Sequence, residues 1–430
     1  MSIKLGRLAG AVALAFCTVV ALPALAATEA QKQAAIDSGL AWLATQQAVN
    51  GSWSGTGYNA ADTSSALLAF IEQKDKPLSW NGQNYTTAVT NGLNYLMTQA
   101  TQVGVGTRPD GFNANIGGSG NGLYWGAISE TTYISGIALS TLARAVSSGY
   151  VSAATPITSS NAAVNGKTYG QVIQESVNMY LAGQTTAVGG NYRGGWHYYP
   201  SQGDADNSTT QWAAIGMLIA QNAGATIPQY TKDELKYWMN YVQNPNGGSG
   251  YSSIYDYVNE SKTGGLLVEM AFTGYDGVTS GPGDYSDKAG ALAFLNANWL
   301  NTASGTWFGN FGHPYAMWSI YKGLESTIGL TDSTTITNLH PQGSNPLDAG
   351  HTWNWYEDYS QYLVDTQSGG TWPGYGYWGG AMGTAWNINI LNATQVGPGP
   401  GPITVPEPGS MALVGLALAA LTGLRRRKSA

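Results

Sequence analysis

An internal repeat restricts the chain to one kind of architecture. Between residues 30 and 392 an amphipathic helical segment recurs, and each copy is followed by a loop rich in glycine and aromatic residues and then by a second, more apolar helical segment. The first copy runs from Gly39-Leu40-Ala41-Trp42-Leu43 through Gln47 and Gly51-Ser52-Trp53 to the apolar segment from Ser65 to Ile71. We count six such pairs, so the sequence predicts twelve helices.

The two segments of each pair differ in their apolar pattern. Apolar residues at positions i, i+3, i+4 and i+7 give the first segments one apolar stripe, as in Leu235, Trp238, Met239 and Val242. The second segments, such as Trp212 to Ala220, are apolar on nearly every side and must therefore be buried on every side. Two concentric rings satisfy both patterns, so we predict an all-α (α/α)6 toroid over residues 28–396 with the one-faced helices outside.

The repeat resembles the QW motif of squalene–hopene cyclases and the related protein prenyltransferases. Two copies have the whole pattern of an aromatic–aliphatic pair, three residues, Gln and Gly-x-Trp: Trp42-Leu43 with Gln47, Gly51 and Trp53, and Tyr362-Leu363 with Gln367, Gly370 and Trp372. In the second and third copies Gln99 and Gln184 come one residue early, and in the fifth copy Trp299 occupies the Gln position. The resemblance implies the toroid fold more strongly than it implies any activity.

The resemblance also draws attention to Asp204-Ala205-Asp206-Asn207. The cyclases protonate an alkene with the middle acid of an Asp-x-Asp-Asp motif, a role that would fall to Asp206. Asn207 replaces the third Asp, so a like-charge neighbour that would raise the pKa of Asp206 is missing. The alternative is that Asp206 forms an Asx turn and caps the next helix. The cyclases also hold their substrate between two helical domains, whereas this chain has residues for one toroid. Cyclase-like, proton-initiated chemistry is therefore a third hypothesis only.

Four acids are candidate catalytic residues: Asp62, Glu130, Asp204 and Asp206. Each lies near the start of a second-type helix, and in a toroid those helix starts share one mouth. Two carboxyl groups about 5–9.5 Å apart could cleave a glycosidic bond. The alternative is that each acid stabilises its own helix N-terminus. Glu269 could join the cluster.

Aromatic residues crowd the loops and are candidate ligand-binding residues, because exposed rings stack on sugars or apolar chains. The residues selected are Tyr192, Trp196, His197, Tyr198, Trp355, Tyr375 and Trp378. The alternative is that these rings fill space between the helices. No cofactor and no metal site are expected, since the only cysteine, Cys17, precedes the toroid and the four histidines lack ligand spacing.

Residues 1–26 have the pattern of a secretory signal peptide. Lys4 and Arg7 precede an apolar run from Leu8 to Leu22, and Ala24-Leu25-Ala26 is typical of a cleavage site. An uncleaved membrane anchor is the alternative, although the run is short for a membrane span.

A Gly/Pro linker, residues 397–405, leads to a C-terminal segment, residues 406–430. In that segment Pro406-Glu407-Pro408 is followed by an apolar stretch from Gly409 to Leu424 and by Arg425-Arg426-Arg427-Lys428. This order resembles the PEP-CTERM sorting signal and implies an exosortase-type enzyme as partner, in a Gram-negative bacterium that makes exopolysaccharide. Before processing, the apolar stretch would be a transmembrane helix of about 24 Å. An ordinary C-terminal anchor is the alternative.

The charge balance excludes nucleic acid as a partner. The two tails hold six of the 18 basic residues and one of the 25 acidic residues, which leaves 12 basic against 24 acidic residues. We therefore expect a protein of the cell envelope, outer surface or extracellular matrix whose toroid binds a ligand, with exopolysaccharide as the candidate. The alternative hypothesis is an exported carbohydrate-active hydrolase or lyase with its acids at the toroid mouth.

Overall fold

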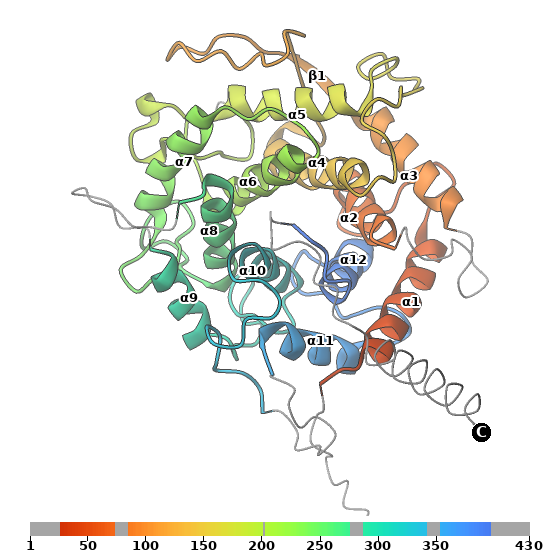
Figure 1. Cartoon of the computed structure of the whole chain (residues 1–430), viewed down its shortest axis with the longest axis vertical. Helices are drawn as coiled ribbons and strands as arrows, with labels where there is room; N and C mark the ends of the chain where they lie inside the picture. The colour runs from red at the N-terminus through yellow and green to blue at the C-terminus, as the bar shows by residue number, and fades with distance from the viewer. Residues whose placement is uncertain (1–25, 74–84, 201–202, 276–286, 342–352, 397–430) are drawn as a thin grey trace, which may run out of the picture.

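The chain forms two concentric rings of α-helices (Figure 1). The computed structural model describes residues 26–73, 85–200, 203–275, 287–341 and 353–396. The predicted linker and sorting segment, and all but the last residue of the predicted signal peptide, lie outside these ranges. The described residues contain twelve α-helices, which alternate along the chain between the outer and the inner ring, as the repeat predicted.

The bounds of the elements follow the chain order. The outer helices are α1 (Glu29–Gln46), α3 (Thr86–Gln99), α5 (Tyr169–Gly183), α7 (Gln229–Val242), α9 (Lys288–Ala297) and α11 (Trp355–Thr366). The inner helices are α2 (Asn59–Ile71), α4 (Thr131–Ser147), α6 (Asn207–Asn222), α8 (Glu260–Thr273), α10 (Pro314–Thr327) and α12 (Gly380–Leu391). Short elements in the loops are the antiparallel hairpin β1 (Thr101–Gly104) and β2 (Asn121–Tyr124), and the 3-10 helices η2 (Ile128–Glu130) and η3 (Ala187–Tyr192).

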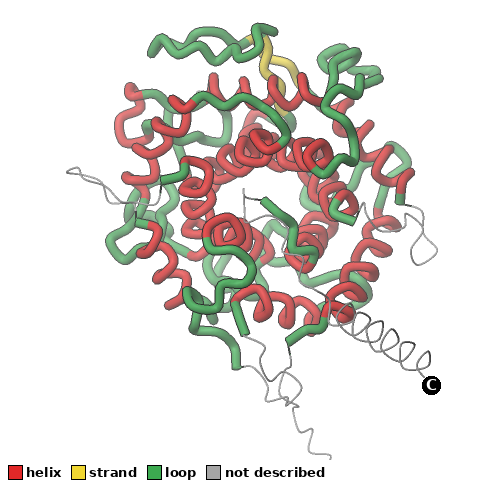
Figure 2. The backbone as a smooth tube through the Cα atoms, in the orientation of Figure 1, coloured by secondary structure: helices red, strands yellow, loops and turns green. Residues whose placement is uncertain are grey.

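The inner ring closes on itself. Each inner helix packs on the next one along the chain, and α12 packs on α2 (Figure 2). Glycines allow some of these helices to approach closely. A Cβ atom on Gly136 of α4 would lie 2.4 Å from the carbonyl oxygen of Trp212 in α6, and one on Gly264 of α8 would lie 2.7 Å from the backbone nitrogen of Ile320 in α10. The inner helices can form so tight a ring because these positions carry no side chain.

The burial of the two rings confirms the predicted patterns. In α2 every residue from Ala60 to Ile71 is buried. In α7 the buried set is a stripe that includes Leu235, Trp238, Met239 and Val242, and the rest of the helix is more exposed. The core of the molecule therefore lies between the rings and inside the inner ring.

A repeated hydrogen bond joins each of four loops to its outer helix. In every case a buried tryptophan donates its indole N–H to a backbone carbonyl near the helix C-terminus. The pairs are Trp53 with Leu43 (2.7 Å), Trp125 with Leu96 (2.8 Å), Trp196 with Tyr180 (2.9 Å) and Trp372 with Leu363 (2.7 Å). The second copy therefore does contain this tryptophan, which the insertion of the β1–β2 hairpin separates from its helix and hides from a search by spacing.

The motif glutamines connect neighbouring outer helices. The side chain of Gln47 donates to the carbonyls of Gly51 and of Ala88 in α3, and Gln184 donates to Gly194 and to Thr231 in α7. Gln367 donates to Ala35 in α1 at 2.8 Å and so helps to close the outer ring.

The register of the third copy differs from the prediction. The tryptophan bond shows that Tyr180, and not Leu181, is equivalent to Leu43, so Gln184 is in register with Gln47. In the second copy the tryptophan bond goes to Leu96, so Gln99 does come one residue before the position equivalent to Gln47, as predicted. The end of α3 is instead bonded by Asn161, whose side chain donates to the carbonyls of Met97 and Ala100.

The chain after α12 turns back into the ring at the C-terminal ends of the inner helices (Figure 2). Tyr321 donates its hydroxyl to the carbonyl of Thr394 at 2.9 Å, and the backbone of Val396 donates to Glu325 at 3.2 Å. The side chain of Val396 reaches the centre of the ring. One end of the toroid is therefore closed by the chain itself.

We predict that Gly136→Ala destabilises the fold whereas Gly216→Ala leaves it nearly unchanged. A Cβ on Gly136 would overlap backbone atoms of Trp212 at 2.4 Å, and such overpacking costs about 1–3 kcal/mol, more than the roughly 1 kcal/mol that alanine contributes to helix propensity. A Cβ on Gly216 meets the carbonyl of Gly136 at 3.3 Å, a much milder contact. Urea denaturation of both variants checks this, and equal stability of the two would contradict it.

Candidate functional site

All six inner helices begin at one end of the toroid, which we call the mouth. Successive contacts show the parallel direction in α8 and α10: Ser319 of α10 bonds the carbonyl of Ser261 in α8, and one turn further along both helices a Cβ atom on Gly323 would lie 2.5 Å from the carbonyl oxygen of Gly264. The six loops that lead from an outer to an inner helix therefore line the mouth. Their described residues are 47–58, 100–130, 184–200 with 203–206, 243–259, 298–313 and 367–379.

Neighbouring loops of the mouth are joined by hydrogen bonds. The backbone of Thr132 donates to Tyr198, that of Asn207 donates to Tyr251, and the side chain of Asn259 donates to the carbonyl of Trp307, at 2.8–3.0 Å. Tyr375 donates its hydroxyl to the carbonyl of Gly305. These links hold the loops in fixed positions relative to one another.

Exposed aromatic side chains gather at the mouth. Six of the eight exposed aromatic side chains among the described residues belong to loops leading into inner helices: Tyr58, Tyr255, Tyr257, Trp307, Phe308 and Tyr377. Tyr377 is 68% exposed and Trp307 is 39% exposed. Exposed rings that cluster on one face mark binding surfaces for sugars and apolar chains.

Four of these rings and Trp378 make up two contacting groups, which we together call the aromatic arc: Tyr257 with Phe308, and Trp307 with Tyr377 and Trp378. The groups are joined through the chain, because Trp307 and Phe308 are adjacent residues. The ring centroids of Trp307 lie 5.8 Å from Tyr377 and 5.6 Å from Trp378, and those of Tyr257 and Phe308 lie 6.3 Å apart. Trp378 stacks on Tyr315 at 4.8 Å and donates its indole N–H to the hydroxyl of Tyr133 at 3.3 Å. The arc therefore connects the rim of the mouth to the rings that fill its floor.

The seven aromatic residues selected from the sequence do not lie together in the structure. Trp378 and Tyr375 lie at the mouth, where both rings contact His313. Trp378 is buried there, with 8% of its surface exposed, so the expectation of an exposed ring face was wrong for it. His197 and Tyr198 lie in the loop before α6, with centroids 5.0 Å apart. Tyr192 instead packs on Trp238 and Tyr241 of the outer helix α7.

For Trp196 and Trp355 the expectation of exposed ring faces was wrong, because both side chains are fully buried. Trp196 makes the repeated indole bond to its outer helix, and Trp355 donates its indole to Gly329 at the far end of the toroid. For these two residues the alternative, that the rings fill space between helices, holds.

Asp206 is the N-cap of α6, as the capping alternative predicted. One carboxylate oxygen accepts the backbone N–H groups of Ser208 and Thr209 at 2.8 and 3.0 Å, and the other accepts the hydroxyl of Thr209. The carboxyl is fully buried, with Nε2 of His197 at 3.7 Å. Burial raises the pKa of Asp206 although Ser208 and His197 act in the opposite direction. A third Asp in the motif is therefore not needed to raise it.

The other predicted acids have different surroundings. Asp62 lies within the first turns of α2 and accepts the backbone N–H and the hydroxyl of Thr56, each at 3.1 Å, so it braces the loop and does not cap the helix. Burial raises the pKa of Asp62 to about 6. Glu130 is half-buried beside Tyr58, and Asp204 is 44% exposed next to His197.

Tyr251 and Lys262, which lie beside the predicted residue Tyr198 and beside Tyr315, were missed by the sequence analysis. The hydroxyls of Tyr198 and Tyr251 are hydrogen-bonded at 3.2 Å, and the ammonium group of Lys262 lies 5.6 Å from the ring of Tyr251 and 5.8 Å from that of Tyr315. Burial lowers the pKa of Lys262 to about 8. The signal that could have found Tyr251 and Lys262 is their position just before and just after the start of an inner helix.

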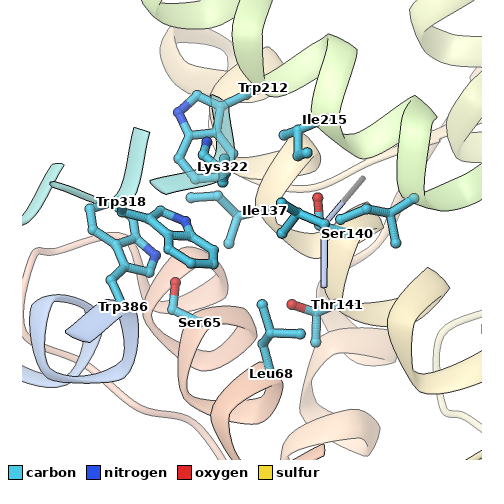
Figure 3. Close-up of a pocket in the computed structure, with 12 residues that line it drawn as sticks. Ser65, Leu68, Ile137, Ser140, Thr141, Trp212, Ile215, Trp318, Lys322 and Trp386 are labelled. Carbon is cyan, nitrogen blue, oxygen red and sulfur yellow. The ribbon is translucent and has the colours of Figure 1, made fainter. Parts of the chain in front are cut away.

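The centre of the ring holds a buried lysine and almost no free space. Figure 3 shows Lys322 beside the ring of Trp212, with Trp318 and Trp386 nearby. The ammonium group lies 3.6 Å from the centroid of Trp212, and burial lowers the pKa of Lys322 well below its usual value. The void that these side chains line is about 10 Å³, roughly one water molecule. No long hydrocarbon fits there.

Glu269 does not join the acids at the mouth. It lies roughly 14 Å along the helix axis from the start of α8. Its carboxyl is fully buried, and neither oxygen has a hydrogen-bond partner among the described residues. Burial raises the pKa of Glu269 well above its usual value of 4.5, and the charge of Asp206 acts in the same direction.

Comparisons with known proteins identify the C-terminus and the fold. Residues 404–428 match the PEP-CTERM protein-sorting motif, so the chain is an exported protein that an exosortase sorts to the cell surface. This confirms the predicted signal. No curated protein matches the chain. A selenomethionine derivative of the GH76 α-mannanase of Bacteroides thetaiotaomicron matches in structure with a TM-score of 0.50 and 11% identity, over 85% of this chain and 95% of the mannanase. At that identity the likeness concerns the fold alone.

The described residues contain neither a cluster of metal-binding side chains nor a membrane-spanning helix. No group of three or more His, Cys, Asp or Glu side chains in these ranges could hold a metal ion. No helix in the described part of the chain is long and apolar enough to cross a membrane, and the predicted transmembrane segment at 409–424 lies outside it.

We predict that Glu269→Gln changes how stability depends on pH. Because folding raises the pKa of Glu269, above about pH 4.5 this carboxyl ionises in the unfolded chain but stays protonated in the folded protein. The wild type therefore loses up to about 1.4 kcal/mol of stability per pH unit relative to the variant. The difference should be absent at pH 4 and grow towards pH 8 in denaturation experiments. The exposed Glu29→Gln is the control and should follow the wild type. Parallel pH profiles of Glu269→Gln and the wild type would show that this carboxyl ionises freely when folded.

Proposed function

We propose that this exported protein binds a polysaccharide at the mouth of its toroid without cleaving it, as a component of the cell envelope or extracellular matrix. The aromatic arc is the observation that carries the proposal. Its rings come from three successive loops, and two of them, Tyr257 and Tyr377, are more than half exposed. Hydrogen bonds between the loops hold the rings in place. Sugar rings stack on such preorganised aromatic faces at little entropic cost.

The surroundings of the acids favour binding over hydrolysis. A glycosidase needs two carboxyl groups free to reach a scissile bond. Both oxygens of Asp206 and of Asp62 already accept hydrogen bonds from their own loops or helices, and both side chains are fully buried. Two of the four predicted acids are therefore occupied by structural bonds.

A carbohydrate-active hydrolase or lyase is the second candidate function. Glu130 is the acid that favours it, because this side chain is half-buried at the mouth next to Tyr58. Burial also raises the pKa of Asp62, near the start of α2, to about 6. One accessible carboxylate with one acid that stays partly protonated near neutral pH is a combination that glycosidases use.

Cyclase-like chemistry has less support than polysaccharide binding or polysaccharide cleavage. It would require a cavity for a hydrocarbon, and the void on the ring axis is about 10 Å³. The resemblance to squalene–hopene cyclases is therefore proposed to concern the architecture of the repeat and no shared reaction.

We predict that Trp307→Ala and Tyr377→Ala each weaken polysaccharide binding about tenfold, which is the loss of roughly 1.4 kcal/mol of stacking. Affinity electrophoresis in gels containing the exopolysaccharide of the producing cell measures this. An α-mannan gel should be included, because the structural neighbour is an α-mannanase. The control is Tyr237→Ala, which removes a 51% exposed ring from the outer helix α7. Equal mobility of the wild type and both mouth variants would contradict the proposal.

The same polysaccharide, recovered after incubation, decides between binding and cleavage. Binding alone predicts chains of unchanged length. Shortened chains that disappear with Glu130→Gln or Asp62→Asn would establish the enzyme instead. Asp206→Asn should be tested in the same assay, because asparagine also caps helices and this variant should preserve the fold.

A further inference from the structure

The loops that lead into the inner helices are rich in acidic residues and poor in basic ones. The six loops contain five acids, Asp110, Glu130, Asp204, Asp206 and Asp256, and no lysine. Asp110 bonds Tyr230 of the outer helix α7 and Asp206 is fully buried, which leaves Glu130, Asp204 and Asp256 for the surface of the mouth. The only arginines of these loops are Arg108 and Arg193, which pair with Asp110 at 2.5 Å and with Glu234 at 2.7 Å. Lys262 is buried, so among the described residues the surface of the mouth carries carboxylates without an unpaired lysine or arginine, and His197 lies 3.7 Å from Asp204.

These acids lie next to the aromatic side chains. Glu130 is close enough to Tyr58 and Tyr198 to raise the pKa of both phenols, after the larger effect of burial. Tyr198 is bonded to Tyr251, whose ring lies 6.4 Å from Tyr257 of the aromatic arc. Asp256 adjoins Tyr257 in the chain. Glu130 and Asp256 therefore each adjoin a tyrosine of the connected series Tyr198, Tyr251 and Tyr257.

We infer that the mouth selects a cationic amino-sugar polymer, one that contains unacetylated hexosamine units, over neutral and anionic polysaccharides. The inference rests on the proposed function and specifies its ligand. An ammonium group gains from both features of this surface, since aromatic faces attract cations and carboxylates pair with them. A uronic acid polymer would meet only like charge, on a body that is itself strongly acidic.

The accessible acids Glu130 and Asp204 give this selectivity a direct test. Asp204 is 44% exposed, and Glu130 is half-buried at the helix start. Neither makes an ion pair with a lysine or arginine among the described residues, so a ligand ammonium group would not need to displace one. Removing two partly exposed ion pairs should weaken the binding of a cationic glycan about three- to tenfold.

The experiment compares matched glycans with the full-length protein in detergent. The probes are a β-linked glucosamine oligomer, its fully N-acetylated counterpart and a uronic acid oligomer, titrated at pH 6 where a primary amine of this kind is protonated. We expect the glucosamine oligomer to bind about tenfold more tightly than the acetylated one, and the uronic acid oligomer to bind more weakly than either. Added salt should reduce only the first affinity.

The double variant Glu130→Gln/Asp204→Asn should lose three- to tenfold in affinity for the glucosamine oligomer and keep its affinity for the acetylated one. The control, Glu29→Gln/Asp233→Asn, removes the same charge from the outer helices α1 and α7 and should bind as the wild type does. Equal affinity of the wild type for both oligomers, or preference for the uronic acid, would overturn the inference and leave polysaccharide binding standing. Absence of binding to every glycan, including the exopolysaccharide of the producing cell, would overturn the proposed function itself.

Discussion

The closed ring of parallel inner helices is the constraint on which the rest of the structure depends. Glycines at the contacts of α4 with α6 and of α8 with α10 let these helices approach so closely that backbone meets backbone. Once the ring is closed and parallel, every helix N-terminus and every loop before it must lie at the same end. The gathering of aromatic rings and acids at the mouth is thus a consequence of packing at some distance from it.

The acids at the mouth show why position alone does not identify a catalytic residue. Asp206, Asp62 and Glu130 all lie near the starts of inner helices, yet the first caps its helix, the second braces a loop, and only the third remains partly open to a ligand. Burial changes the proton affinity of the first two whether or not they react. A raised pKa therefore reflects the depth of the site in these cases as much as any chemistry.

Two ionisable side chains buried in the core reduce the stability of the fold. Glu269 and Lys322 are both fully enclosed, and the structure shows no oppositely charged side chain paired with either among the described residues. Each should therefore fold in its neutral form, at a cost that depends on pH. Lys322 recovers part of that cost through the face of Trp212 when it is charged.

The sequence by itself determined the repeat, the two kinds of helix, the toroid and the sorting signal, because helical periodicity and a short ordered motif are local properties of a chain. Only the tertiary structure decided which aromatic rings are exposed. Trp196 and Trp355 belong to aromatic-rich stretches as Trp307 and Tyr377 do, but the first two bond to carbonyls inside the ring and the last two face solvent. The register of Gln184 and the separation of Glu269 from the mouth were likewise settled in three dimensions. The exposure of a side chain is decided by what packs against it from distant parts of the chain, and no local pattern contains that information.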